Sequence, residues 1–320
     1  MRIYVAHETV FRYDAPCTGM IQILRLTPRN HAGQYVVNWR IDVSADCRLE
    51  PTQDAFGNIV HALSLAGPVS ELRLMVDGEV ETQDTAGVVR SAVERFSPGL
   101  FLRETALTRP DAAILAYAGQ FLRPTAASTL STLHNLLARI YQDFAADGAK
   151  TTAADPAADA AAAAPAAAPS APWAVPAAAD AFKAGRGQSR DLAHIFISVA
   201  RALGVPARFV AGYVRHGNGN GNGAFAQAEQ TASYGAGSTA GDGMGNHWTG
   251  DCWAEAHVPG LGWIGFDPAG GVCATDQYVR VAIGLDYLGA APVRGFHYGG
   301  VQEDVVVRLR VTQAARQTQE

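Results

Sequence analysis

A change in the spacing of apolar residues constrains the fold of this chain more than any other feature of its sequence. From Arg2 to about Thr82, apolar residues recur at every second position, as in the run from Ile3 to Phe11. Between Leu100 and Phe144 they recur three and four residues apart. Alternation is typical of half-buried strands and the wider spacing of amphipathic helices. The sequence therefore predicts an N-terminal domain resembling a β-sandwich, followed by a helical region.

The second half of the chain mixes helices and strands. A stripe of apolar residues from Leu192 to Leu203 predicts a core helix that ends at Gly204 and Pro206. ARFVAGYV reads as a buried strand, DCWAEAHVPGLGWIGFDPAGG as two strands around a Pro-Gly turn, and DVVVRLRV as a last alternating strand. The predicted fold class is α+β, with a β-rich domain at 1–95 and an α+β core at 96–315.

Local signals refine these predictions. The run from Leu72 to Val76 is expected to end in a turn at Asp77-Gly78. The segments DAAILAYAGQFL and TLSTLHNLLARIYQDF are each expected to form a helix.

Two stretches of biased composition interrupt the core. Residues 151 to 180 contain 17 alanines and 5 prolines, and the prolines remove backbone donors that a helix needs. We expect an exposed insertion over 145–180, which a protease would cut first. Residues 216–247 are rich in glycine and predict a mobile loop. A phosphate-binding loop would lead into a helix with Lys-Ser or Lys-Thr, which this stretch does not contain.

Composition and charge exclude several classes of function. The 320 residues are 48% hydrophobic, which is enough for a substantial core and suggests two domains. The net charge is -5 and the 25 lysines and arginines are scattered, so neither nucleic acid nor a membrane surface is an expected partner. The first residues alternate like a strand and no apolar run approaches about 18 residues, so we expect a cytoplasmic protein.

The cysteines give no sign of a disulfide framework or of a metal. Cys17, Cys47, Cys252 and Cys273 lie far apart without a CxxC pair, which argues against disulfides and structural zinc. Each is expected to be a small buried hydrophobic residue. No cofactor and no metal are predicted.

Three short segments in the second half follow one another in a specific order. They are GQSRDLAH at 187–194, DCWAE at 251–255 and GFDP at 265–268. This series resembles the bacterial transglutaminase-like superfamily, whose core is papain-like. The segments HETVFRYDAP, LRLTPRN and DAFGN in the first 60 residues resemble the β-rich domain that precedes this core in bacterial members. The resemblance covers nearly the whole chain apart from the two biased stretches.

The resemblance implies a catalytic triad whose residues have changed. In the family, a helix opens with G-x-C-R-D-x-A-H, one strand reads H-A-W-x-E and the next ends with G-x-D-P, and their Cys, His and Asp form the triad. Ser189 stands at the cysteine position and Asp251 at the histidine position, while Asp267 keeps the aspartate. Active relatives cleave or transfer amide bonds.

The altered residues are poorly suited to that chemistry. A serine hydroxyl is a weaker nucleophile than a thiolate and needs a base, and an aspartate with an ordinary pKa of about 3.9 is a poor one. Repulsion between Asp251 and Asp267 could raise one carboxyl pKa. The sequence thus favours a pseudoenzyme that binds a peptide or protein partner, with peptide-ligase-type proteins as partners that the resemblance suggests. One alternative is an amide-bond hydrolase or acyl transferase that uses Ser189 with carboxylate assistance. Another is a structural protein that interacts through its β domain.

Residues near the three positions have plainer interpretations. Ser189 is expected to cap its helix, and His194 to be a packing histidine of the core. Cys252 should point to the opposite face of its strand from Asp251, which argues against its use as a substitute nucleophile. His247 as a displaced base would break the register of the motif. A metal site formed by Asp251, Asp267 and a histidine remains a minor alternative.

Overall fold

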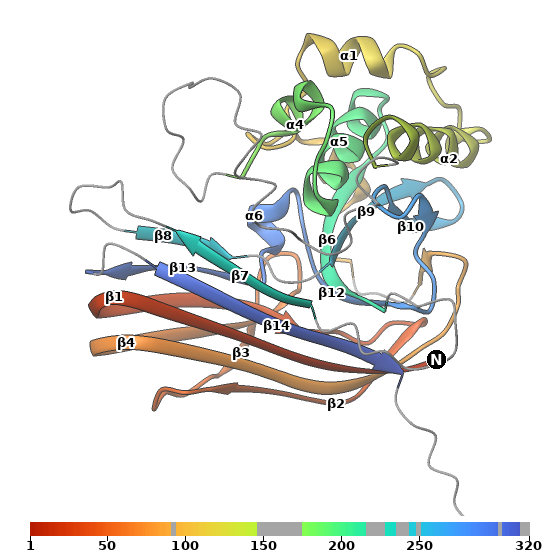
Figure 1. The fold of residues 1–320 in the computed structure, drawn as a ribbon. Helices are drawn as coiled ribbons and strands as arrows, with labels where there is room; N and C mark the ends of the chain where they lie inside the picture. The colour runs from red at the N-terminus through yellow and green to blue at the C-terminus, as the bar shows by residue number, and fades with distance from the viewer. Residues whose placement is uncertain are drawn as a thin grey trace, which may run out of the picture.

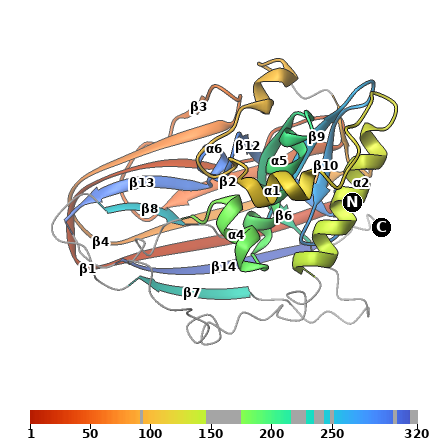
Figure 2. The same cartoon turned by 90° about the horizontal axis from the view of Figure 1, so that it is seen from above.

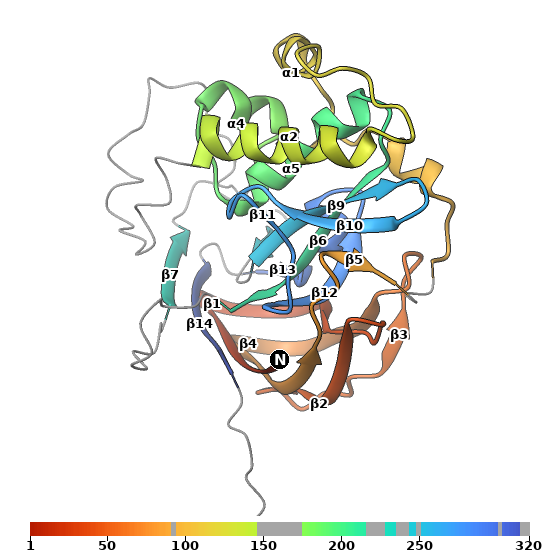
Figure 3. The ribbon, with the colours of Figure 1, turned by 90° about the vertical axis from the view of Figure 1, so that its right-hand side faces the viewer.

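Two β-sheets and a layer of helices make up the protein (Figure 1). The computed structural model describes residues 1–90, 94–145, 175–215, 228–234, 243–247, 251–299 and 303–313. One sheet has eight strands and the other six, and the helices cover the face of the six-stranded sheet that is turned away from the larger sheet (Figures 1 and 3). This arrangement confirms the predicted α+β class, with a β-rich N-terminal domain before the core.

Two long strands form the centre of the eight-stranded sheet. β1 (Arg2–Thr27) and β4 (Ile59–Thr82) pair in antiparallel fashion along most of their length, as the alternation predicts. The remaining strands of this sheet are β2 (Gln34–Val43), β3 (Pro51–Gln53), β7 (Ala228–Tyr234), β8 (Gly243–His247), β13 (Val293–Tyr298) and β14 (Glu303–Gln313). β13 and β14 come from the end of the chain and pair with β1, so the N-terminal sheet is completed by C-terminal strands (Figure 2).

The turn expected at Asp77-Gly78 is wrong, because β4 continues through both residues. Gly78 lies beneath the indole of Trp39 on β2, and a Cβ built on Gly78 would collide with that ring. Gly78 therefore allows the neighbouring strand to approach closely. An Asp-Gly pair in a sequence does not show whether its glycine forms a turn or makes room for a neighbouring side chain.

The prediction of a loop over 216–247 is also wrong in part. Its backbone forms β7, which pairs with β14, and β8, which pairs with β13. Edge strands present unpaired N–H and C=O groups. A glycine-rich segment can pair with them, because strand pairing uses backbone groups and needs no particular side chain. The rest of this stretch lies outside the described residues. So does most of the predicted insertion, up to residue 174, while Ala178–Ala184 forms helix α4.

The six-stranded sheet carries the motif segments. Its order is β11 (Val272–Cys273), β10 (Gly262–Asp267), β9 (Asp251–Val258), β6 (Ala207–Val214) and β12 (Tyr278–Gly284), with β5 (Val88–Val89) paired to β10. Every residue of β6 is buried, because it lies inside the sheet and both faces are covered. This burial explains its unbroken apolar sequence.

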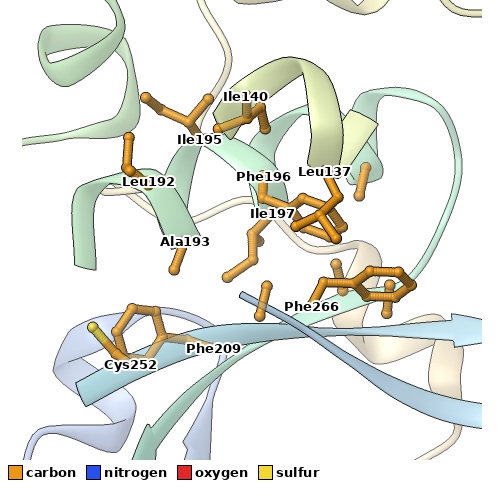
Figure 4. Packing of buried hydrophobic residues seen from close by; sticks show 14 of the residues in the cluster. Leu137, Ile140, Leu192, Ala193, Ile195, Phe196, Ile197, Phe209, Cys252 and Phe266 are labelled. Carbon is orange, nitrogen blue, oxygen red and sulfur yellow. The ribbon is translucent and has the colours of Figure 1, made fainter. Parts of the chain in front are cut away.

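Four helices pack over this sheet, and the sequence predicts three of them. The fourth, α4, begins inside the stretch that was expected to be exposed, and its Ala178 is buried, so that expectation is wrong at this end. α1 (Ala112–Ala118), α2 (Thr129–Ile140) and α4 surround α5 (Ser189–Ala202), which rests on β9. Figure 4 shows α5 and α2 pressing apolar side chains onto Phe209, Cys252 and Phe266 of the sheet. Residues 191–201 of α5 are buried on all sides, so the predicted stripe is only part of its buried surface.

Shorter helical segments are Pro98–Leu102, Tyr141–Ala145 and α6 (Tyr287–Ala290). Across the described parts of the chain, no helix combines the length and apolar character needed to cross a membrane.

Side-chain amides join the two sheets at the edge strand β12. Gln34 donates to the carbonyl of Arg280 and accepts from its N–H, at 2.8 and 2.7 Å. Asn58, from the DAFGN segment, makes the same pair of bonds with Ile283, both at 2.8 Å. Each side-chain amide thus takes the place of a neighbouring strand. It satisfies backbone N–H and C=O groups at the edge of β12 and links the two sheets.

Candidate functional site

Ser189 begins helix α5 as its first helical residue and does not cap it. The capping position belongs to Gln188, whose backbone is extended and whose N–H donates to Asp191 Oδ2 at 3.1 Å. The expectation that Ser189 is the cap is therefore wrong. The side chain of Asp191, three positions after the cap, accepts the N–H of the capping residue. The hydroxyl of Ser189 is therefore available for another partner.

That partner is Cys252 on the neighbouring strand. Ser189 Oγ lies 3.3 Å from Cys252 Sγ. The thiol is 2% exposed, and burial raises its pKa well above the ordinary value, with the charge of Asp251 adding to the effect and the Ser189 contact opposing it. Cys252 is therefore a neutral, enclosed thiol that is poorly suited to nucleophilic attack.

Side chains of β9 alternate between the two faces of the sheet, as predicted. The expectation that Cys252 would therefore point away from the site is wrong. Cys252 packs with the helical core, whereas Trp253 belongs to a cluster on the other face of the sheet. Because α5 lies on the face of Cys252, it is this thiol that meets Ser189. Which face a helix covers is a tertiary property, and alternation alone cannot supply it.

Asp251 lies at the start of β9 and is half-buried. Its Oδ2 accepts the backbone N–H of Val214, at the end of β6, at 2.9 Å. This bond directs the carboxylate along the sheet toward the neighbouring strand end.

Asp267 ends β10 and is held by three hydrogen bonds. Oδ1 accepts the N–H groups of Ala269 and Gly270 at 2.9 and 3.1 Å, and Oδ2 accepts the hydroxyl of Tyr278 at 2.8 Å. Burial raises the carboxyl pKa; the hydrogen bonds oppose this rise, and the charge of Asp251 adds a smaller upward contribution. Asp267 is thus held in place by hydrogen bonds to residues other than Ser189 and Asp251.

The three triad positions come together at one end of the sheet, and each has a described partner outside the three. Ser189 contacts a thiol, Asp251 a backbone amide, and Asp267 a tyrosine hydroxyl and two amides. A serine nucleophile needs a general base within hydrogen-bond reach. The partner described for its hydroxyl is the thiol of Cys252, with either group able to donate, and a buried neutral thiol is not a general base.

Arg190 adds a positive charge beside the serine. It is half-buried, pairs with Asp191 at 3.2 Å, and its guanidinium lies 5.4 Å from the centre of the Tyr287 ring. Its charge also favours the thiolate form of Cys252, although burial outweighs it in setting that pKa. A half-buried cation at a helix start could hold an anionic group of a ligand.

His194 and His247 lie in different parts of the structure. His194 is fully buried, its Nε2 accepts the N–H of Tyr287 at 3.0 Å, and burial lowers its pKa to about 3. It is the packing histidine that was predicted. The backbone of His247 lies in β8, opposite Val293 of the larger sheet, and its side chain falls outside the described part.

The sequence analysis did not identify a buried ion cluster on β9, the strand that begins with Asp251. Glu255 of β9 accepts Arg208 Nε and Arg280 Nε, both at 2.6 Å, and Arg208 also stacks 3.8 Å from the centre of the Trp263 ring. Arg208 interrupts an apolar strand, and this interruption was the signal that could have revealed a buried partner. Among the described residues, no three potential metal ligands gather in one place.

Comparisons with known proteins match two parts of the chain to family models. Residues 3–81 match the bacterial transglutaminase-like N-terminal region, and residues 144–268 match the transglutaminase-like superfamily. The uncharacterized protein ML0607 of Mycobacterium leprae is 27% identical over 314 residues, which cover 98% of this chain and 99% of that protein. The uncharacterized protein Rv2569c of Mycobacterium tuberculosis is 23% identical, with coverage of 95% and 90%.

A solved structure has the same fold. It is that of a proposed cysteine protease from Cytophaga hutchinsonii, with a TM-score of 0.65, 15% identity, and coverage of 100% of this chain and 92% of that one. At this identity the likeness concerns the fold alone.

Proposed function

Because the chain belongs to the transglutaminase-like superfamily, we propose that it is a member without catalytic activity, which binds a peptide or a protein partner at the Ser189 site. The observation that carries this proposal is the contact of Ser189 Oγ with the buried thiol of Cys252. The hydroxyl lies beside a neutral thiol. Asp251, at the histidine position, accepts a backbone N–H, and Asp267, at the aspartate position, accepts a tyrosine hydroxyl.

The same geometry supports binding in place of catalysis. Ser189 and Arg190 are half-buried at the start of α5, where the helix dipole and the guanidinium both favour a negatively polarised group of a ligand. A peptide carbonyl or carboxylate has this character. No proton transfer is required for such binding.

Two assays test the proposal. The first measures cleavage of peptide nitroanilides by the purified protein, with Ser189→Ala as the matched control and with iodoacetamide present to block thiols. We expect the wild type to release no more nitroaniline than Ser189→Ala. Release that persists in iodoacetamide and disappears in Ser189→Ala would establish a serine hydrolase and overturn the proposal.

The second assay measures binding by nuclear magnetic resonance. Mixtures of short peptides with free carboxylates are added to labelled protein, and the amide signals of Ser189, Arg190 and Asp191 are followed. We expect these signals to shift, and the shifts to weaken in Arg190→Gln. Shifts confined to the eight-stranded sheet would instead support an interaction protein that uses its β domain.

A further inference from the structure

Cys273 and His134 form a second thiol-containing pair, separate from Ser189. Sγ of Cys273 lies 3.4 Å from Nε2 of His134, although 139 residues separate them in the chain. Cys273 is half-buried at the end of β11, and His134 is exposed on α2. A thiol and an imidazole within hydrogen-bond reach are the parts of an activated nucleophile.

Ordered elements hold the pair in place. In the pairing of β10 with β11, Cys273 lies opposite Phe266, so both side chains are on the helical face of the sheet. The ring of His134 meets Phe266 edge to face at 5.8 Å, and Phe266 stacks on Phe196 of α5 at 5.2 Å. The imidazole is therefore oriented by the buried core and the thiol by a strand.

The other three cysteines do not share these surroundings. Cys17 and Cys252 are buried. Cys47 is half-buried like Cys273, but within the described part of the chain it has no imidazole beside it, and burial together with the charge of Asp46 raises its pKa. Cys47 is thus an internal control that is half-buried like Cys273 but has no described base beside it.

We propose that Cys273 is a thiol–disulfide exchange site, with His134 as its base, that accepts small disulfides and carries the resulting mixed disulfide. His134 takes the thiol proton, and the sulfur attacks one sulfur of the disulfide. A new S–S bond forms at Cys273, the original S–S bond breaks, and the departing thiolate takes the proton from His134. Cys273 is oxidised and half of the small disulfide is reduced, so electrons balance.

A base is needed at this position. Burial raises the pKa of the Cys273 thiol above its ordinary value, so at neutral pH little thiolate is present without help. The exposed imidazole gives the leaving thiolate a proton donor that solvent can reach. This inference goes beyond the proposed function and does not depend on it.

Disulfide exchange fits the surroundings better than acyl transfer does. Attack on a carbonyl builds an oxyanion that needs backbone N–H donors aimed at it. The N–H of Ala274, the residue after the thiol, already donates to the carbonyl of Gly265 at 3.1 Å. Attack on a sulfur atom builds no such oxyanion, so it has no need of that donor.

The test measures mixed-disulfide formation on the intact protein with glutathione disulfide and, separately, with dithiodipyridine. Peptide mapping by mass spectrometry gives a rate for each cysteine at pH 7. We expect Cys273 to react on the order of a hundredfold faster than Cys47, at the lower end of what general-base assistance provides. His134→Gln should slow Cys273 toward the rate of Cys47 and leave Cys47 itself unchanged.

Two control measurements accompany this test. His134 is exposed and loses one edge-to-face ring contact in His134→Gln, so this variant should lower the thermal midpoint by no more than a few degrees. Cys273→Ser should abolish the fast phase entirely. Equal rates at Cys273 and Cys47, or a Cys273 rate that His134→Gln does not alter, would overturn the proposal. Neither result would bear on amide cleavage or peptide binding at Ser189.

Discussion

The buried carboxylate of Glu255 should make a large and pH-dependent contribution to stability. Burial alone would raise its pKa, but the charges and hydrogen bonds of Arg280 and Arg208 outweigh burial and lower the pKa from 4.5 to about 2. This lowering of the Glu255 pKa corresponds to about 3 kcal/mol of stability. The variant Glu255→Gln keeps the shape and removes the charge. Arg280 then faces a neutral amide, while Arg208 keeps its ion pair with Glu94 at 2.7 Å.

The sign of the pH dependence follows from the direction of the shift. A carboxyl whose pKa is lower in the folded state stabilises the fold above its unfolded pKa, and this contribution is lost as the pH falls from about 4.5 to about 2. We therefore expect Glu255→Gln to be less stable than wild type by about 3 kcal/mol at pH 7, and this difference to shrink toward pH 2.

Urea unfolding at a series of pH values measures the difference. Glu71→Gln is the control, because Glu71 forms an exposed ion pair with Arg12, and such pairs contribute about 0 to 1 kcal/mol. A loss below about 1 kcal/mol for Glu255→Gln at pH 7, or a loss that stays constant down to pH 3, would refute the account of a stabilising buried ion cluster.

Three other predictions concern the site and its supports. Ser189→Cys should form a disulfide with Cys252 under oxidising conditions, seen by non-reducing peptide mapping; two persistent free thiols would contradict the described contact. Wild type should lose stability as the pH falls from 6.5 toward about 3, since His194 is held neutral by burial, and His194→Gln should flatten this part of the unfolding profile; parallel profiles would count against it. Gly212→Ala should lower the thermal midpoint and change the near-ultraviolet dichroism of Trp253, because a Cβ would collide with the carbonyl of Val279 and would lie 2.6 Å from that indole; an unchanged midpoint and spectrum would contradict this crowding.

The sequence alone predicted the regular elements of this protein. Backbone geometry fixes the periods of two and of three to four residues, so the alternation in β1 and the spacing in α1, α2 and α5 can be read without knowing any neighbour. The resemblance of three short segments also identified Ser189, Asp251 and Asp267 as positions that belong together, and the structure gathers them at one end of one sheet.

Only the tertiary structure decided which partners these positions have. α5 packs on one face of β9, and that choice gives Ser189 the thiol of Cys252 as its neighbour. The same holds for Gly78, which allows a strand to pass beneath Trp39 where the sequence suggested a turn.

Contacts across long stretches of chain were beyond the sequence for a physical reason. The pairing of β14 with β1, the ion pairs of Glu255, and the approach of His134 to Cys273 each join residues tens to hundreds of positions apart. Local periods record which face of an element is buried, whereas the identity of the covering residues depends on how whole elements pack. That packing is set by the shape and burial of the complete core.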